Sequence, residues 1–270
     1  MRRSVVGVKY NILPNIRSAE EVAQNLIYPE TKKPEENMIK NKAENKRYIA
    51  SIEKSKKQVM EEIHESIQEK DYSKKPLICI MDGALILWTI LKEVFGDISN
   101  KVLILDIIHV VEYIWKVANQ KYKEGSKKSK DYVYNKLKLI LEGKVSEYIQ
   151  ELEDEVIKIK GKKKKEIILK VIKYLKNHEE YMKYDEYLAC GYPIGTGVIE
   201  SACGHVVKDR MEIRGARWGI KGGENVLKLR SVLRSDDWDG YWDFLMRKAR
   251  DDKKAVFVAD DYYESLKLAA

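Results

Sequence analysis

The sequence predicts an α/β protein with a mixed sheet and a large all-helical insertion. Three observations lead to this prediction. Residues 2–12 alternate apolar and polar side chains, two short apolar runs at 77–81 and 102–105 flank a helical segment, and residues 107–190 are rich in Lys, Glu, Leu and Ile with few strand signals. A period of two indicates a half-buried strand, whereas a short continuous apolar run indicates a strand buried on both faces.

Local signals define the elements before the first apolar run. The strand at 2–12 ends at a Pro-Asn turn, and residues 18–21 (Ser-Ala-Glu-Glu) form a capping box that predicts a short helix through Leu26. Residues 28–46 are polar and contain two prolines, so a loop is expected there. Apolar residues recur at helical spacing within 53–69 and predict a second helix.

The centre of the chain predicts a strand, a helix and a second strand. The helix is expected at 84–95, ended by Gly96, between the apolar runs. Because such a crossover returns the chain in the same direction, the two strands are expected to be parallel neighbours. Residues 191–250 return to Gly-rich turns with two or three helices. The predicted segments are 1–106, 107–190, 191–250 and a tail at 251–270.

Composition gives a weak indication of the partner. The chain has 51 basic and 43 acidic residues, a net charge of +8. An excess of basic over acidic residues favours a polyanionic partner. A chain with many charged residues of both signs is, however, also typical of a very soluble protein. The four lysines at 162–165 are more typical of a solvated helix start than of a dedicated phosphate-binding site.

Nothing in the sequence indicates a membrane or an oxidising compartment. No run approaches the roughly 20 apolar residues of a membrane helix, and the N-terminus lacks the apolar region of a signal peptide. The three cysteines form no CxxC pair, and Cys79 lies inside an apolar run as a small core residue would. We therefore expect a cytoplasmic protein with no membrane partner.

Acidic residues stand at the ends of three predicted elements. Asp82 follows the first apolar run, Asp106 and His109 follow the second, and Glu200 lies in the first turns of a helix after the Gly/Pro-rich stretch 191–197. Sheets of α/β proteins carry their chemistry at the carboxyl ends of their strands. Carboxylates at such positions can hold divalent cations that catalyse in-line attack on a phosphodiester.

Each candidate also has a purely structural interpretation. Asp82 and Asp106 can cap turns or helices, and His109 can be a satisfied histidine among apolar neighbours. Glu200 is flanked by apolar residues, which predicts a mostly buried carboxylate that needs a metal or a nearby arginine; Gly204 is expected to permit close packing on that face. Zinc-ligand spacing, a phosphate-binding loop and a GxSxG motif are absent.

Several stretches together resemble a known family. They are residues 81–83, 106–115, 184–187, 191–200, 207–211 and 215–218. These stretches resemble DDE transposases of bacterial insertion sequences of the ISKra type. The resemblance extends from about Val5 to Trp242 and is most specific between residues 191 and 218.

The resemblance implies a ribonuclease-H-like core that contains a helical insertion. It implies that Asp82 and Glu200 are catalytic ligands of Mg²⁺ or Mn²⁺, with Asp106 and His109 as an auxiliary motif. The residues expected to meet DNA are Lys208, Arg210, Arg214, Arg217 and Trp218, although a core position is also typical of a Trp. The implied partners are DNA, as element ends and target, and a second copy in a homodimer.

One feature departs from the family. The first catalytic Asp belongs on a strand that precedes residues 2–12, yet no Asp precedes Asp71. The expected sheet is therefore truncated at its first strand, and the chain corresponds to a C-terminal catalytic portion that is inactive alone. An upstream-encoded N-terminal portion is then an expected partner.

Two alternatives stay open. In the first, Asp82, Asp106 and Glu200 form a complete triad, because two adjacent parallel strands bring their terminal residues together. In the second, the chain is a non-catalytic remnant that binds DNA or inhibits an intact transposase.

Overall fold

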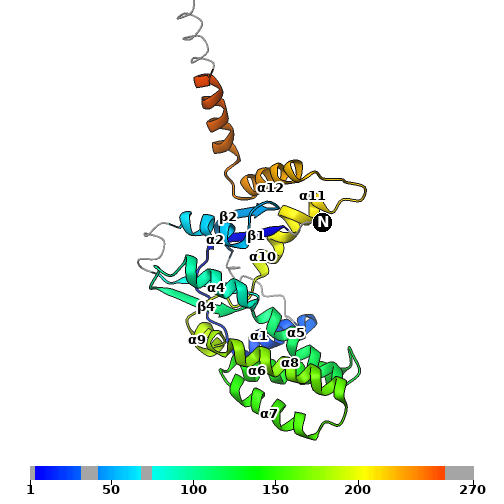
Figure 1. Cartoon of the computed structure of the whole chain (residues 1–270). Helices are drawn as coiled ribbons and strands as arrows, with labels where there is room; N and C mark the ends of the chain where they lie inside the picture. Colours follow the sequence, from blue (N-terminus) through cyan, green and yellow to red (C-terminus); the bar gives the residue numbers. More distant parts are fainter. Residues whose placement is uncertain (1–3, 32–41, 68–74, 253–270) are drawn as a thin grey trace, which may run out of the picture. The chain divides into compact units, whose positions relative to one another are not determined.

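The computed structural model describes residues 4–31, 42–67 and 75–252. This part of the chain is a mixed α/β structure, 63% helical with two small sheets, which confirms the predicted α/β class (Figure 1). Contacts divide the chain into two units, each built from non-consecutive segments. Unit 1 comprises Met1–Asn11, Glu44–Ser55 and Ser201–Ala270, and unit 2 comprises Ile12–Ala43 and Lys56–Glu200.

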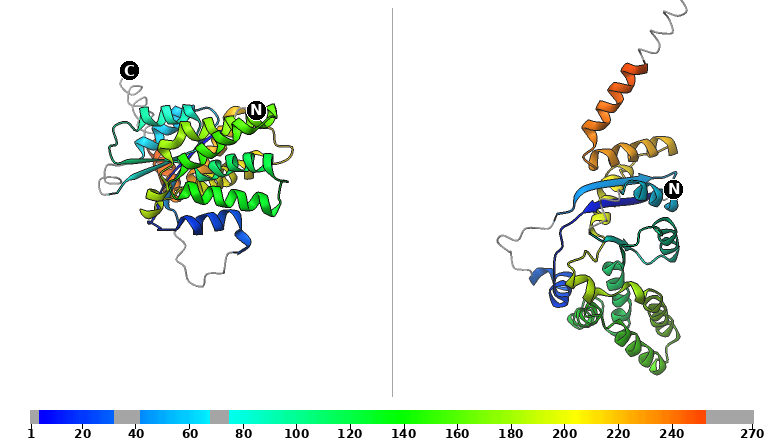
Figure 2. Two further views of the ribbon diagram at one scale, coloured as in Figure 1. Left: turned by 90° about the horizontal axis from the view of Figure 1, so that it is seen from below. Right: turned by 90° about the vertical axis from the view of Figure 1, so that its left-hand side faces the viewer.

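The sheet of unit 1 is an antiparallel pair. Strand β1 (Val5–Asn11) pairs with β2 (Glu44–Ser51), with Val5 opposite Ser51 (Figure 2). The strand predicted at 2–12 is confirmed, but the loop predicted at 28–46 is wrong at its end, where β2 begins. Strand β2 is polar, and only Ala50 and Ser51 are buried. Its partner is distant in sequence, so local composition gave no strand signal. Residues 32–41 of the predicted loop lie outside the described residues.

Helices complete unit 1. They are the end of α10 (Gly197–Ala202), a π-helical turn η3 (Cys203–Lys208), α11 (Asp209–Met211) and α12 (Ile220–Arg234), and residues 238–252 are also helical. Helix α12 packs against β2. Ala50 of β2, Val206 of η3, Met211 of α11 and Leu227 of α12 form a small core.

The sheet of unit 2 is the predicted parallel pair. Strand β3 (Leu77–Met81) runs beside β4 (Lys101–Leu105), and α4 (Leu85–Val94) connects them. All five residues of β3 are only half-buried, so the prediction of a strand buried on both faces is wrong. The reason is that β3 pairs with β4 alone among the strands that the structure describes.

The outer edge of β4 is covered by α9 (Tyr184–Ala189). The N–H of Asp106 donates to the carbonyl of Met81 at 2.9 Å, so the carbonyls of Leu103 and Leu105 face away from β3. The hydroxyl of Tyr184 donates to Leu105 O at 2.7 Å, and that of Tyr187 donates to Leu103 O at 3.1 Å. These bonds satisfy backbone groups that an open edge would expose.

The predicted helical block is confirmed. Four long helices, α5 (Ile107–Lys121), α6 (Lys127–Leu141), α7 (Val145–Lys158) and α8 (Lys162–His178), pack side by side (Figure 1). Their apolar faces form the largest core of the described residues. Lys162, Lys163 and Lys165 are exposed at the first turn of α8, in agreement with a solvated helix start.

Shorter helices surround this block. Helix α1 (Ala19–Ile27) packs on α6, and the Ser18 hydroxyl accepts from Glu21 N at 3.1 Å, which confirms the predicted cap. The 3₁₀ turns η1 (Pro29–Thr31) and η2 (Glu179–Tyr181) follow α1 and α8. No helix in the described ranges is both long and apolar enough to cross a membrane.

Helix α2 (Lys56–Glu65) packs on α4 around a second apolar cluster that includes Leu91, Phe95 and Ile98. Cys79 is half-buried against this cluster. Burial raises the pKa of its thiol to about 12, so this cysteine is a packing residue with little thiolate at neutral pH.

Candidate functional site

The candidate site of unit 2 lies where β3 and β4 end. The register pairs Met81 with Leu105, the last residues of the two strands. Asp82 and Asp106 are the next residue of each strand, and the bond from Asp106 N to Met81 O continues the ladder. The parallel pair therefore places these two acidic residues next to each other in the fold, the proximity on which the complete-triad alternative depends.

Asp82 closes the turn into α4. Its Oδ1 accepts from the N–H of Ala84 at 3.0 Å, and the intervening Gly83 has a φ of +80°. A positive φ favours glycine, which explains the Asp-Gly sequence. The Asp82 side chain is exposed. The turn thus uses one carboxylate oxygen, and the residue still presents its charge to solvent.

Asp106 is fully buried, with 0% of its surface exposed. It caps α5, because its Oδ1 accepts from Ile108 N at 3.1 Å. The N–H of Thr196 donates to the same oxygen at 3.3 Å, and the Thr196 hydroxyl donates to Oδ2. A buried carboxylate is stable only when such donors compensate for lost hydration. The helix-cap interpretation of Asp106 therefore describes a role that the structure shows.

His109 lies one turn further along α5, on the same face as Asp106. Its Nε2 is 3.9 Å from Asp106 Oδ2, and its Nδ1 is 3.4 Å from Glu112 Oε2. The side chain is 36% exposed. The imidazole is thus flanked by two carboxylates and reaches solvent, where it can meet a ligand.

Glu200 is tied to the same strand end through Thr196. Its backbone N–H donates to Thr196 O at 3.0 Å, while the Thr196 side chain holds Asp106. Glu200 is exposed, so the prediction of a mostly buried carboxylate is wrong. Its neighbours Val198 and Ile199 are only half-buried, and a Cβ on Gly204 would meet nothing within 4 Å, so no close packing occurs there either.

The described residues form no preformed site for the metal ions that the resemblance implies. The described residues contain no group of three or more His, Cys, Asp and Glu that could hold a metal ion. The carboxylate oxygens of Asp106 already accept hydrogen bonds from three donors, whereas the side chains of Asp82 and Glu200 are exposed.

Sequence reasoning missed Tyr174 on α8. Its ring stacks on Tyr113 with centroids 3.7 Å apart, and its buried hydroxyl has no hydrogen-bond partner in the described part. Burial raises the pKa of Tyr174 well above its usual value, and Tyr113, Asp82 and Asp106 raise it further. Both strand-end carboxylates therefore act on one hydroxyl. No local motif marks Tyr174, because Tyr113, Asp106 and Asp82 lie 61, 68 and 92 positions away from it in the sequence.

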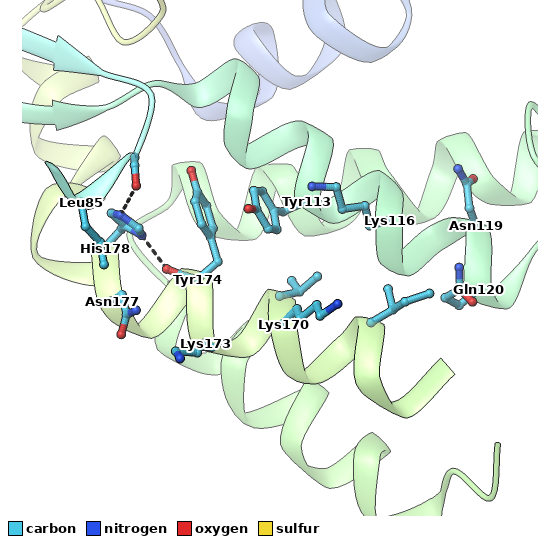
Figure 3. A pocket seen from close by; sticks show the side chains of 13 residues that line it. Leu85, Tyr113, Lys116, Asn119, Gln120, Lys170, Lys173, Tyr174, Asn177 and His178 are labelled. Carbon is cyan, nitrogen blue, oxygen red and sulfur yellow. Dashed lines mark hydrogen bonds between the residues drawn. The ribbon is translucent and has the colours of Figure 1, made fainter. Parts of the chain in front are cut away.

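His178 was missed for the same reason. It is 2% exposed, and its two ring nitrogens lie 2.7 Å from Tyr174 O and 2.8 Å from Gly83 O (Figure 3). This side chain joins the end of α8 to the Asp82–Gly83 turn. Helix α8 is thereby fixed beside the strand ends.

The predicted DNA contacts belong to unit 1. Lys208, Arg210, Arg214 and Arg217 are all exposed, as a surface that meets DNA requires. Trp218 is half-buried against the small core of unit 1, and the Arg210 guanidinium lies 5.7 Å from its ring centroid. The structure thus favours the core interpretation of Trp218 over a base-stacking one.

A buried glutamate in unit 1 was also missed. Glu224 on α12 is 2% exposed. The Ser51 hydroxyl donates to both of its oxygens at 3.0 Å, and Ile52 N donates to Oε2 at 2.8 Å. Lys228 Nζ lies 3.4 Å from Oε1. Glu224 therefore caps the end of β2 from the helix that packs on it.

No protein-family model, curated protein or solved structure matches this chain. Any assignment of function therefore depends on the residues described above.

Proposed function

We propose that this chain is the catalytic portion of a DDE transposase of a bacterial insertion sequence, with a ribonuclease-H-like core. The observation that carries the proposal is the position of Asp82 and Asp106 at adjacent carboxyl ends of two parallel strands. Open α/β sheets bind their ligands at this edge. The proposed reaction is cleavage and joining of DNA phosphodiesters.

The proposal gives the acidic residues different roles. Asp82 and Glu200 are exposed carboxylates, which suits ligands of Mg²⁺ or Mn²⁺ once DNA is bound. Asp106 is a positioning residue, because it holds Thr196 and through it the first turn of the Glu200 helix. His109 is exposed enough to contact a phosphate. When bound, the metal ions would stabilise charge on the attacking and leaving oxygens.

DNA contact by unit 1 is part of the same proposal. The four exposed cations Lys208, Arg210, Arg214 and Arg217 suit the sequence-independent neutralisation of phosphates. Pairing of two copies on two DNA ends is proposed by analogy with the family alone.

A nicking assay tests the catalytic proposal. The full chain is incubated with supercoiled plasmid and Mg²⁺ or Mn²⁺, with EDTA as the blank. If the chain is active, Glu200→Gln and Asp82→Asn should each lower the nicking rate at least about a hundredfold. The matched control is Glu147→Gln, since Glu147 is also an exposed glutamate in the first turn of a helix. Nicking that survives both site variants contradicts the assignment.

A non-catalytic DNA-binding protein is the second candidate. The absence of a three-ligand metal group among the described residues favours it. This candidate predicts DNA affinity that falls steeply with salt and no metal-dependent nicking at any protein concentration. Metal-dependent cleavage that is lost in Glu200→Gln rules it out.

A further inference from the structure

A pocket of about 640 Å³ opens between α5 and α8, beside the first turn of α4. This volume lies within the range of about 300–1,000 Å³ that is typical of sites for small organic groups. Figure 3 shows Tyr113 and Tyr174 face to face between Leu85, His178 and Asn177 at one end and Asn119 and Gln120 at the other. The Tyr174 end adjoins the Asp82–Gly83 turn, because Gly83 itself lines the pocket.

The lining combines an apolar floor with polar groups around it. Ile167 and Val171 provide apolar surface beside the stacked rings of Tyr113 and Tyr174, and Asn119, Gln120 and Asn177 provide amides. A flat heterocycle fits such a lining, because its faces need apolar contact while its edges need donors and acceptors. Nucleobases have this chemistry.

Three lysines give the pocket its charge. Lys116, Lys170 and Lys173 line it, and all three are exposed. No carboxylate within the described ranges lies at ion-pair distance from any of them. Two other lysines of these helices are paired, Lys121 of α5 with Glu155 and Lys176 of α8 with Glu153. The Lys116 ammonium rests 3.6 Å from the centroid of the Tyr113 ring. The pocket thus carries cations that no described carboxylate neutralises.

We infer that this pocket binds an unpaired segment of DNA, with phosphates on the three lysines and a base on the apolar floor. Base–aromatic and base–apolar contact combined with a basic groove is how proteins hold single strands without reading their sequence. A duplex is too wide to enter a groove between two helices in direct contact, whose axes lie roughly 8–10 Å apart. The choice of DNA rests on the proposed function. The pocket lies beside Asp82, so a DNA strand bound there leads to the ends of β3 and β4.

The test is fluorescence anisotropy of a labelled thymidine oligonucleotide, long enough to span a site of about 4–16 nucleotides. The full chain is titrated in EDTA, so that binding is measured without any metal-dependent reaction. The variant K116A/K170A/K173A removes the pocket charges. The matched control K162A/K163A/K165A removes three exposed lysines from the first turn of α8, with the same change in net charge.

The pocket variant should raise Kd about tenfold or more, while the control raises it less than about threefold. The slope of log K against log salt should fall in magnitude by about 2, since each single-strand phosphate contact contributes roughly 0.7. Equal losses in the two variants mean general electrostatic attraction and overturn the inference. A duplex that is weakened as much as the single strand overturns it too.

This experiment separates the two proposals. Pocket-dependent binding without nicking supports the inference and leaves the catalytic proposal without support. Nicking without pocket-dependent binding supports catalysis and rejects the pocket as a strand site. Circular dichroism of each variant should show a retained fold, since all substituted lysines are exposed.

Discussion

Replacing Asp106 with Ala should destabilise unit 2 by about 3 kcal/mol. The substitution removes the cap of α5, a loss of about 0.5–2 kcal/mol. It also leaves the N–H and hydroxyl of the half-buried Thr196 without their acceptor, at about 1–3 kcal/mol for an unsatisfied group. Urea unfolding followed by circular dichroism measures the loss, and hydrogen exchange of the first amides of α5 locates it.

Two variants sharpen this prediction. Asp106→Asn keeps an acceptor for Ile108 and Thr196, so it should lose less than half as much stability as Asp106→Ala. Asp82→Ala removes one exposed bond to Ala84 and should cost no more than about 1 kcal/mol. If Asp106→Ala is as mild as Asp82→Ala, the buried carboxylate does not stabilise the end of β4 and the start of α5.

Replacing Glu224 with Ala should destabilise unit 1 by about 3 kcal/mol. The carboxylate accepts from Ser51, Ile52 and Glu53, so its removal leaves several donors at the end of β2 without a partner. Glu224→Gln should be intermediate, because its amide group can satisfy only some of these donors. The matched control is Glu212→Gln, since Glu212 is exposed, and this variant should change stability by less than about 0.5 kcal/mol.

The stability that Glu224 provides should depend on pH. Burial, the largest single influence, raises its pKa, but the bonds from Ile52, Ser51 and Glu53 and the charge of Lys228 outweigh burial, and the net pKa is lowered. A carboxyl whose folded pKa is below its unfolded value of about 4.3 stabilises the fold above that value. Its contribution is lost as pH falls through the folded pKa.

Acid unfolding measures this dependence. The free energy of unfolding of the wild type should fall more steeply below about pH 4.3 than that of Glu224→Gln, which has no carboxyl to protonate. Parallel pH profiles for the two proteins contradict the role of Glu224 as a charged cap.

Sequence patterns were sufficient to predict those helices and strands whose signals lie within a few consecutive residues. The alternation at β1, the capping box before α1 and the two apolar runs of β3 and β4 each lie within a few residues, and the structure has all of them. Strand β2 shows the limit. Its polar residues form a strand because β1 offers them backbone partners, and such pairing is not encoded in their own composition.

Burial was the property that the sequence predicted least well. Glu200 has apolar neighbours in sequence yet is exposed, and β3 is wholly apolar yet half-buried. Exposure depends on which other elements cover a surface. In β3 one side lacks a described strand partner, and around Glu200 the adjacent Val198 and Ile199 pack only partly.

The sequence by itself determined the class of the fold, the helical block, the parallel pair and the position of Asp82 and Asp106 at its end. These properties follow from periodicity and from the rule that a helical crossover returns the chain in parallel. Only the tertiary structure decided that Asp106 is buried under Thr196, that Glu224 caps β2 and that Tyr113, Tyr174 and three unneutralised lysines share one pocket. The Tyr113–Tyr174, Asp106–Thr196 and Ser51–Glu224 contacts join residues 61, 90 and 173 positions apart, and packing alone brings them together.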